Sequence, residues 1–174
     1  MHMSDSRVIA ADRATVWAAL LSREVLQDCV PGCQEMTGNP EEGFEATVVQ
    51  KVGPVKATFK GAVTLSDMVE GESLTLTGEG KGGAAGFAKG GAQVSLSDAE
   101  EGGTLLTYEV EAKVGGKLAQ LGSRIIDGFA KKMADQFFTR FQEAIEGPSE
   151  DAAAEETGEG EEKKKGWFKR VISR

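Results

Sequence analysis

Histidine is nearly missing from this chain of 174 residues, and cysteine is scarce. The only histidine is His2, and the two cysteines are Cys29 and Cys33. Without an internal imidazole, the usual Ser-His-Asp and Cys-His catalytic arrangements are excluded. Two thiols also fall short of the ligand set of a structural zinc site. We therefore assign no catalytic residues and no metal site from the sequence, and expect a protein that is not an enzyme.

The two cysteines stand in the segment CVPGC, residues 29–33. A redox pair or half of a metal site is one interpretation, and two ordinary loop thiols is the other. The spacing differs from the C-x-x-C of thioredoxin-like motifs. Thiols also stay reduced in the cytoplasm. The pattern thus favours the loop thiols and leaves redox use as the alternative.

Long hydrophobic runs are missing too. No segment approaches the ~18 uninterrupted apolar residues of a membrane-spanning helix, and MHMSDSRV is not followed by the apolar stretch of a signal peptide. The expected location is therefore the cytoplasm.

Charge is unevenly spread along the chain. The formal net charge is −8, made up of −7 over residues 1–146, −7 over 147–162 and +6 over 163–174. An acidic domain disfavours nucleic acid as a partner, because phosphates would be repelled. The pattern predicts three units: a globular domain over 1–146, an acidic disordered linker over 147–162 and a basic tail over 163–174.

Apolar spacing predicts the elements of the domain. We expect a strand over 6–11, a helix over 13–21 that Asp12 caps, and a short helix that Ser22 caps and Pro31-Gly32 ends. Alternating apolar residues then predict five or six short strands between residues 44 and 114. Apolar residues at three- or four-residue spacing then predict one long helix from Lys117 to Ile145. Strands that run together, with helices at either end, predict an α+β fold with an antiparallel sheet against which the long helix packs.

Three segments resemble the CoxG family, the G subunits of carbon monoxide dehydrogenase. They are VIAADRATVWAALLSREVLQDCVPGCQEM, VGPVKATFKGAVTL and GTLLTYEVEAKVGGKLAQLGSRII, and the resemblance covers about residues 6–146. It implies a START-like (SRPBCC) helix-grip fold: a curved antiparallel sheet around a long helix, with an apolar cavity between them. It also implies an accessory role beside a molybdenum hydroxylase, membrane recruitment of that enzyme, and binding of a respiratory quinone such as menaquinone or ubiquinone.

Within such a fold, the apolar stripe gains a second interpretation beside ordinary core packing. Tyr108 is either a core residue or a hydrogen-bond donor to a quinone carbonyl. The residues that we expect to line the cavity are Phe59, Phe87, Tyr108, Leu118, Leu121, Ile125, Phe129 and Met133.

Phe87 belongs to this set because of the glycine-rich run GEGKGGAAGFAKGG. We expect a flexible hairpin loop there, or a mobile lip whose Phe87 caps a ligand. Gly78, Gly80 and Gly83 fit G-x-G-x-x-G only formally, since strands are expected on both sides and no βαβ unit surrounds them.

The tail carries aromatic and aliphatic residues among its cations. On a helix, Trp167, Phe168, Val171 and Ile172 would share one face, which is typical of an interfacial membrane anchor. The alternative is a solvated basic end that pairs loosely with its own acidic linker. The residues expected to contact the inner face of the cytoplasmic membrane are Lys163, Lys164, Lys165, Trp167, Phe168, Lys169 and Arg170.

Three functions remain open at this point. The protein binds a quinone or similar lipid and links a molybdenum hydroxylase to the respiratory chain, or it recruits that enzyme to the membrane without carrying a ligand. The third possibility is a START-like cyclase or hydrolase, which the missing internal histidine disfavours.

Overall fold

A computed structural model of the chain describes residues 1–147. The basic tail and all but the first residue of the acidic linker lie outside the described residues. The elements follow in the order β1 (His2–Ile9), α1 (Arg13–Leu20), α2 (Arg23–Cys29), β2 (Cys33–Asn39), β3 (Gly43–Val52), β4 (Val55–Val69), β5 (Ser73–Lys81), η1 (Gly83–Ala85), β6 (Phe87–Asp98), β7 (Thr104–Gly115), η2 (Gly116–Leu121) and α3 (Ser123–Glu146), where η1 and η2 are 3-10 helices.

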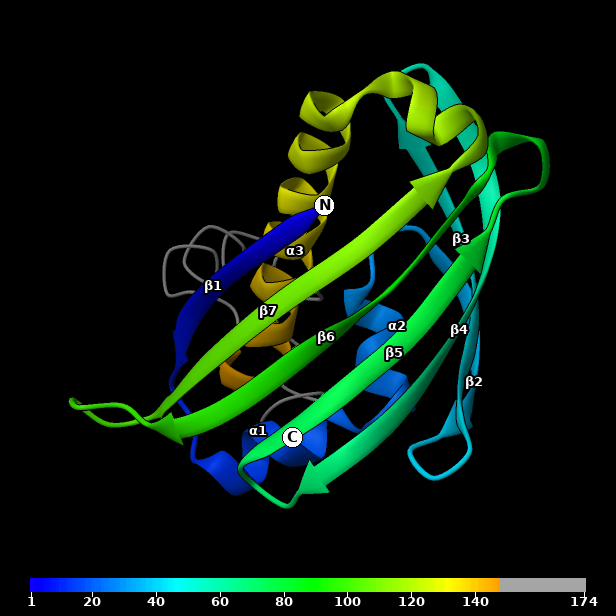
Figure 1. Cartoon of the computed structure of the whole chain (residues 1–174). Coiled ribbons are helices and arrows are strands. Elements are labelled where there is room, and N and C mark those ends of the chain that lie inside the picture. Colours follow the sequence, from blue (N-terminus) through cyan, green and yellow to red (C-terminus); the bar gives the residue numbers. More distant parts are fainter. Residues whose placement is uncertain (148–174) are drawn as a thin grey trace, which may run out of the picture.

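The seven strands form one antiparallel sheet in the order β1-β7-β6-β5-β4-β3-β2. Strands β2 to β7 pair with their neighbours in sequence, and β1 joins the far edge beside β7. The sheet curves, and α3 crosses its concave face while α1 and α2 lie at one end (Figure 1). The expected α+β fold of helix-grip type is confirmed.

Local chemistry explains the starts of the short helices and the tight turn between β3 and β4. The Asp12 carboxylate accepts a hydrogen bond from the Thr15 amide at 2.9 Å, and the Ser22 hydroxyl accepts one from the Val25 amide at 3.3 Å. Each side chain satisfies an amide that the first helical turn leaves unpaired. Gly53 adopts φ 60°, so the expected Gly53-Pro54 turn joins two paired strands.

Several expectations about the elements were wrong. The first strand occupies His2–Ile9 rather than residues 6–11, and β2 was missed altogether. The glycine-rich run is mostly strand, since β5 reaches Lys81 and β6 begins at Phe87. The hairpin loop shrinks to the few residues around η1. Because β5 and β6 pair directly, no βαβ unit surrounds the G-x-G-x-x-G match, as expected.

The expected single helix from Lys117 to Ile145 is in fact two elements. Gly122 has φ 91° and ψ 157°, and it separates the 3-10 helix η2 from α3. Only glycine adopts that backbone conformation readily. The break places Leu118 and Leu121 on a different element from the rest of the apolar stripe.

The packed core occupies the end of the molecule near α1. Phe141, Ile9, Leu106 and Val16 are fully buried there, and Trp17 packs with them. On α3, the rings of Phe137, Phe138 and Phe141 stack on or meet one another at centroid distances of 4.9 to 6.2 Å. The Phe138 ring also stacks on Tyr108 of β7, which joins the C-terminal half of α3 to the sheet.

Side-chain size falls along the concave face towards the other end of the strands. Near α1 the face carries Leu74, Leu96 and Leu106, all of them buried. Further along, the strands pair through small residues instead: Gly78 with Gly90, Gly80 with Ala88, and Gly90 with Ala112. The sheet thus fills the space under α3 at one end and leaves it open at the end formed by the β3–β4 turn, η1 and η2, here called the loop end.

Candidate functional site

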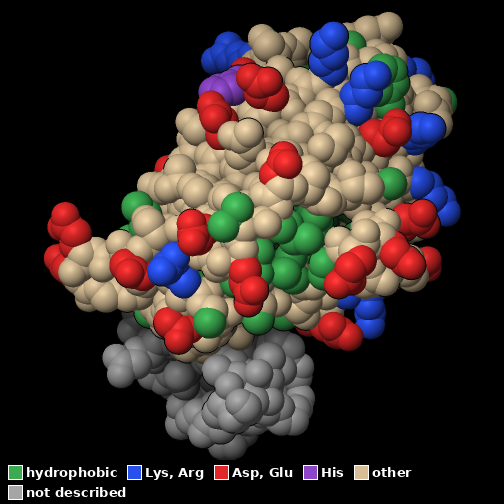
Figure 2. Space-filling view, turned by 60° about the horizontal axis from the view of Figure 1, so that its bottom comes forward, with side chains coloured by type: hydrophobic (Ala, Val, Ile, Leu, Met, Phe, Trp, Pro, Cys, Tyr) green, Lys and Arg blue, Asp and Glu red, His purple; other side chains and the backbone are tan. Residues whose placement is uncertain are grey.

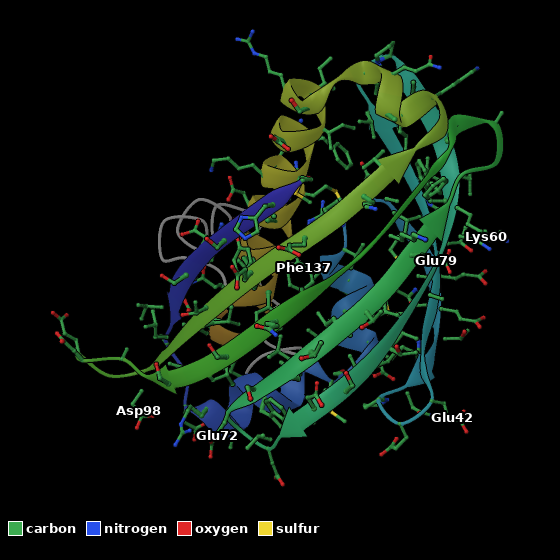
Figure 3. All side chains as sticks on the ribbon, viewed as in Figure 1. Glu42, Lys60, Glu72, Glu79, Asp98 and Phe137 are labelled. Carbon is green, nitrogen blue, oxygen red and sulfur yellow. The ribbon has the colours of Figure 1, made fainter. Side chains whose placement is uncertain are left out.

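A cavity of about 500 Å³ lies between the concave face and α3. Its volume falls within the range of small-molecule sites, which is roughly 300–1,000 Å³. The sheet contributes residues from β1 and from β3 to β7, and Figure 3 places Phe137 of α3 behind the strands. The lining residues include Val48, Gln50, Val52, Phe59, Leu76, Gly80, Ala88, Ala92, Tyr108, Val110, Ala112, Val114, Leu118, Ile126, Phe129, Ala130, Met133, Ala134, Phe137 and Phe138.

Five of the eight expected cavity residues line this space: Phe59, Tyr108, Leu118, Phe129 and Met133. The other three do not. Leu121 and Ile125 lie beside Gly53 at the β3–β4 turn, and Ile125 is 41% exposed. Phe87 is 39% exposed and its ring covers Gly115, so it does not cap the cavity from a mobile lip.

The α3 residues that were missed each follow a residue of the apolar stripe directly in the chain. The helix presents Ile126, Ala130, Ala134 and Phe138 to the cavity beside Phe129, Met133 and Phe137. The face of α3 that lines the cavity is thus wider than the single row of large apolar residues in the sequence pattern. The small residues Ala92 and Gly80 were also missed, because a missing side chain leaves no hydrophobic signal.

Only two lining side chains carry a polar group able to anchor a ligand, Gln50 and Tyr108. Tyr108 is 5% exposed and its ring stacks on Phe138 with centroids 4.9 Å apart. Burial raises the pKa of Tyr108 and nearby Asp5 raises it further, while Arg7 lowers it. The phenol therefore stays protonated at neutral pH and can donate a hydrogen bond.

Arg7 stabilises the closed end of the cavity through contacts with α3. Its guanidinium donates to an Asp135 carboxylate oxygen at 2.7 Å and lies 5.3 Å from the centre of the Phe138 ring. The contact ties the edge strand β1 to the middle of α3. Arg7 Nε is buried and, within residues 1–147, has no hydrogen-bond partner. At the end of the cavity near Tyr108, fixed polar groups therefore lie behind the apolar lining.

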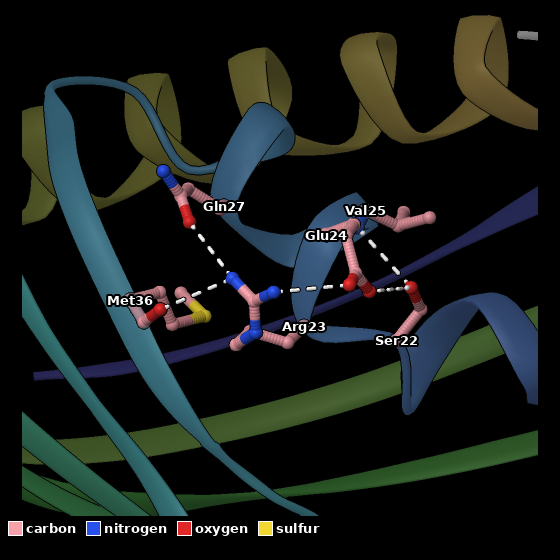
Figure 4. Close-up of polar contacts among 6 residues, drawn as sticks. All are labelled: Ser22, Arg23, Glu24, Val25, Gln27 and Met36. Carbon is pink, nitrogen blue, oxygen red and sulfur yellow. Dashed lines mark hydrogen bonds and ion pairs between the residues drawn. The ribbon is translucent and has the colours of Figure 1, made fainter.

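The wall opposite β1 is held by α2 and the segment that follows it. Arg23 donates to Gln27 Oε1 and to the Met36 carbonyl oxygen, each at 3.3 Å, and pairs with Glu24 at 3.0 Å (Figure 4). The bond to Met36 joins α2 to β2, and the other two hold the guanidinium in place within α2. Gln50 Nε2 donates to the Pro31 carbonyl oxygen, which fixes the segment after α2 against β3. Gln50 keeps a second N–H that can point at a ligand.

The cysteines lie outside the cavity lining and do not form a disulfide. Cys29 is 1% exposed, and burial raises the pKa of its thiol to about 12. Burial also raises the pKa of Cys33. A reactive cysteine needs a lowered pKa, so the structure gives no support to the redox interpretation. Residues 1–147 contain no cluster of three or more His, Cys, Asp or Glu residues suited to a metal ion.

A second hollow of about 840 Å³ opens on the convex face of the sheet. Its lining is of a different kind, with Glu79, Lys89, Glu111 and Lys113 around a floor of small residues. Among the described residues, no helix is long and apolar enough to cross a membrane. The cavity under α3, whose lining is almost wholly apolar, is the better candidate for a small-molecule site.

Comparisons with known proteins agree with this geometry. Residues 6–146 match the family model that describes CoxG, the G subunit of carbon monoxide dehydrogenase. A conserved protein from Geobacillus kaustophilus has a TM-score of 0.77 and 26% identity, covering 82% of this chain and 93% of that one.

Two further solved structures share the fold. A putative uncharacterized protein from Rhizobium leguminosarum has a TM-score of 0.63 at 15% identity, over 82% of this chain and 91% of that one. The protein CV1439 from Chromobacterium violaceum has a TM-score of 0.61 at 16% identity, over 85% of this chain and 98% of that one. No curated protein sequence matches.

Proposed function

Because the chain belongs to the CoxG family of carbon monoxide dehydrogenase, we propose that it serves a molybdenum hydroxylase by carrying a respiratory quinone or similar apolar lipid. In this proposal the ligand occupies the cavity under α3. The protein works at the inner face of the cytoplasmic membrane, where it links the enzyme to the respiratory chain. The family supports the accessory role. The ligand and the membrane contact are the proposed parts.

The cavity is the observation that carries the proposal. A quinone combines an apolar isoprenoid chain with carbonyl oxygens that accept hydrogen bonds. The lining offers a matching combination: almost wholly apolar walls, with the Tyr108 hydroxyl and the Gln50 amide as donors. These two groups stand on β7 and β3, with three strands between them in the sheet. They can therefore meet different parts of one ligand.

A ligand-carrying role fits the cavity better than catalysis does. The only histidine, His2, lies at the surface and contacts Glu109 at 3.1 Å. Tyr108 and Gln50 supply hydrogen bonds, and neither is ionised at neutral pH. We therefore propose that the lining binds and orients its ligand and shields it from water, without changing it chemically.

Organic extraction followed by mass spectrometry tests the ligand. The full chain, purified directly or after incubation with liposomes that contain menaquinone or ubiquinone, should release a quinone or lipid. The variant Ala92→Leu/Ala134→Leu places larger side chains in the cavity and should release much less. Ala62→Leu is the matched control, because Ala62 is exposed on the convex face. Thermal melting checks that all variants fold.

Two results would overturn the proposal. One is a wild-type protein that neither contains nor takes up any quinone or lipid. The other is a cavity-filled variant that retains as much as the wild type. Either result would leave recruitment of the hydroxylase without a ligand as the family role to pursue.

A further inference from the structure

Six lysines cross the convex face near the loop end, and the strand register sets them against one another. Lys51 stands directly opposite Lys56, Lys60 opposite Lys81, and Lys89 opposite Lys113. Like charges in directly opposite positions destabilise a sheet. We call these six residues the lysine stripe: Lys51, Lys56, Lys60, Lys81, Lys89 and Lys113.

The lysine stripe faces solvent. Lys51, Lys60, Lys81, Lys89 and Lys113 each follow a residue that lines the cavity, so the alternation of the strands points them to the opposite face. All six lysines are exposed. Among the described residues, the only ion pair within the stripe joins Lys81 to Glu79 at 4.0 Å. Glu79 also stands directly opposite Lys89, so one opposite-charge pair offsets part of the repulsion between the lysines.

Eight of the acids of the domain lie at the opposite end from the stripe. The hairpins at the opposite end carry Glu41, Glu42, Asp67, Glu70, Glu72, Asp98, Glu100 and Glu101. Figure 3 shows Glu42, Glu72 and Asp98 at that end, while Lys60 lies far from them and has Glu79 beside it. In Figure 2 most basic side chains lie along the top and right edges, with acidic ones among them, while acidic ones predominate at the bottom of the described surface. A domain of net charge −7 therefore carries a cationic surface at its loop end.

Exposed apolar side chains accompany the lysines. Phe87, 39% exposed, stands directly opposite Lys81 on one side and Gly115 on the other. Ile125, 41% exposed, lies beside the β3–β4 turn that joins Lys51 to Lys56 along the chain. Cations with an aromatic residue among them are typical of surfaces that bind the membrane interface.

We propose that the lysine stripe and Phe87 form a docking surface on the folded domain for an anionic lipid bilayer. The choice of cation favours a bilayer over a protein. Protein interfaces are enriched in arginine and depleted in lysine, whereas strands β3 to β7 carry these six lysines and no arginine. Flexible ammonium groups suit a fluid layer of phosphates, because they need no fixed bidentate partner.

The surface differs from the basic tail and lies close to the cavity. Gly80, Ala88 and Val114 line the loop end of the cavity and are chain neighbours of Lys81, Lys89 and Lys113. Docking by the stripe thus brings this end of the cavity to the bilayer surface. The inference rests on the membrane contact in the proposed function, but it does not depend on which ligand the cavity holds.

Charge reversal in the full chain tests the docking surface. The variant Lys60→Glu/Lys113→Glu turns two Lys–Lys pairs into Lys–Glu pairs, so its melting temperature should rise. Its apparent affinity for vesicles that contain phosphatidylglycerol should fall at least about tenfold, since each cation near an anionic leaflet contributes to binding. Phosphatidylcholine vesicles should bind neither protein. A variant that is more stable yet binds less cannot be explained by a folding defect.

The control variant is Lys132→Glu/Arg140→Glu, which makes the same change in net charge at exposed positions of α3. It should keep most of the affinity. The neutral variant Lys56→Gln/Lys89→Gln provides a second measurement and should weaken vesicle binding several-fold.

The proposal is overturned if the stripe variants bind as the wild type does, or if the α3 control loses as much. Loss of binding to the hydroxylase, with vesicle binding intact, would instead identify the stripe as a protein-docking surface and also overturn it. Mass spectrometry of extracts from the same variants tests the ligand separately, because these substitutions leave the cavity lining intact.

Discussion

At the scale of single residues, the buried thiol of Cys29 shows how environment sets chemistry. Its position in CVPGC left open a redox role, but the side chain is 1% exposed. Burial favours the neutral thiol over the thiolate. Sequence spacing alone could not reveal this, because burial depends on the helix α3 that packs against α2 about a hundred residues later in the chain.

We expect Cys29 to resist alkylation in the folded protein at neutral and mildly alkaline pH, while Cys33 reacts slowly. The pKa of Cys29 is raised from 9.0 to about 12. The unfolded chain therefore loses this proton first, and the contribution of Cys29 to stability is lost as pH rises from about 9 to 12. Iodoacetamide labelling with peptide mass spectrometry measures the reactivity. Rapid labelling of Cys29 at pH 7.5 would contradict the assignment.

At the scale of elements, most of the sheet was predictable and one strand was not. Alternation between residues 44 and 114 predicted β3 to β7, and the inward positions Val48, Gln50 and Val52 do line the cavity. Strand β2 was not predicted because its sequence, CQEMTGN, contains a single buried apolar residue, Met36. An edge strand with one buried side chain carries almost no periodic signal.

The cavity could be predicted only in part, for the same physical reason. Large apolar residues such as Phe59, Phe129 and Met133 stand out in a sequence, whereas the volume itself depends on small ones. Glycines in β5 and β6 suggested a loop, since glycine weakens a strand. They are instead paired in the sheet, where Gly78 stands opposite Gly90.

Two glycines give a matched test of the α3 boundary. Gly122→Ala should destabilise the domain by about 1–3 kcal/mol, because φ 91° and ψ 157° are nearly restricted to glycine. Gly128→Ala, within α3, should stabilise it by about 0.5–1 kcal/mol. A new Cβ meets nothing within 4 Å at either site, so the two effects come from the backbone alone. Chemical denaturation measures both, and equal effects would refute the break at Gly122.

At the scale of the whole molecule, charge and cavity are arranged along one axis. The cationic surface lies at the loop end, and the acidic hairpins lie at the other. Helix α3 ends at Glu146, whose carboxylate accepts a hydrogen bond from the Ala10 amide just before α1. The described chain therefore ends, at Gly147, on the side of the domain away from the lysine stripe.

Deleting residues 163–174 tests the tail as a second membrane contact. The truncated chain should sediment with phosphatidylglycerol vesicles much less than the full chain, since six cations are lost. Raising the salt concentration should weaken the binding of the full chain to these vesicles in the same assay. The far-ultraviolet circular dichroism of the domain should stay unchanged. Sedimentation that is insensitive to both the deletion and salt would remove the anchor from the proposal.

The gradient of side-chain size along the concave face also divides the molecule by rigidity. The large rings of Phe138 and Phe141 fix one end, while the glycines and alanines of β5 and β6 leave few contacts to break at the other. Segments with few buried contacts open at a lower free energy than the whole domain. The loop end can therefore part from α3 while the aromatic core stays folded. In the proposed function, exchange of the ligand then requires only a local fluctuation, and its rate is set separately from the global stability of the protein.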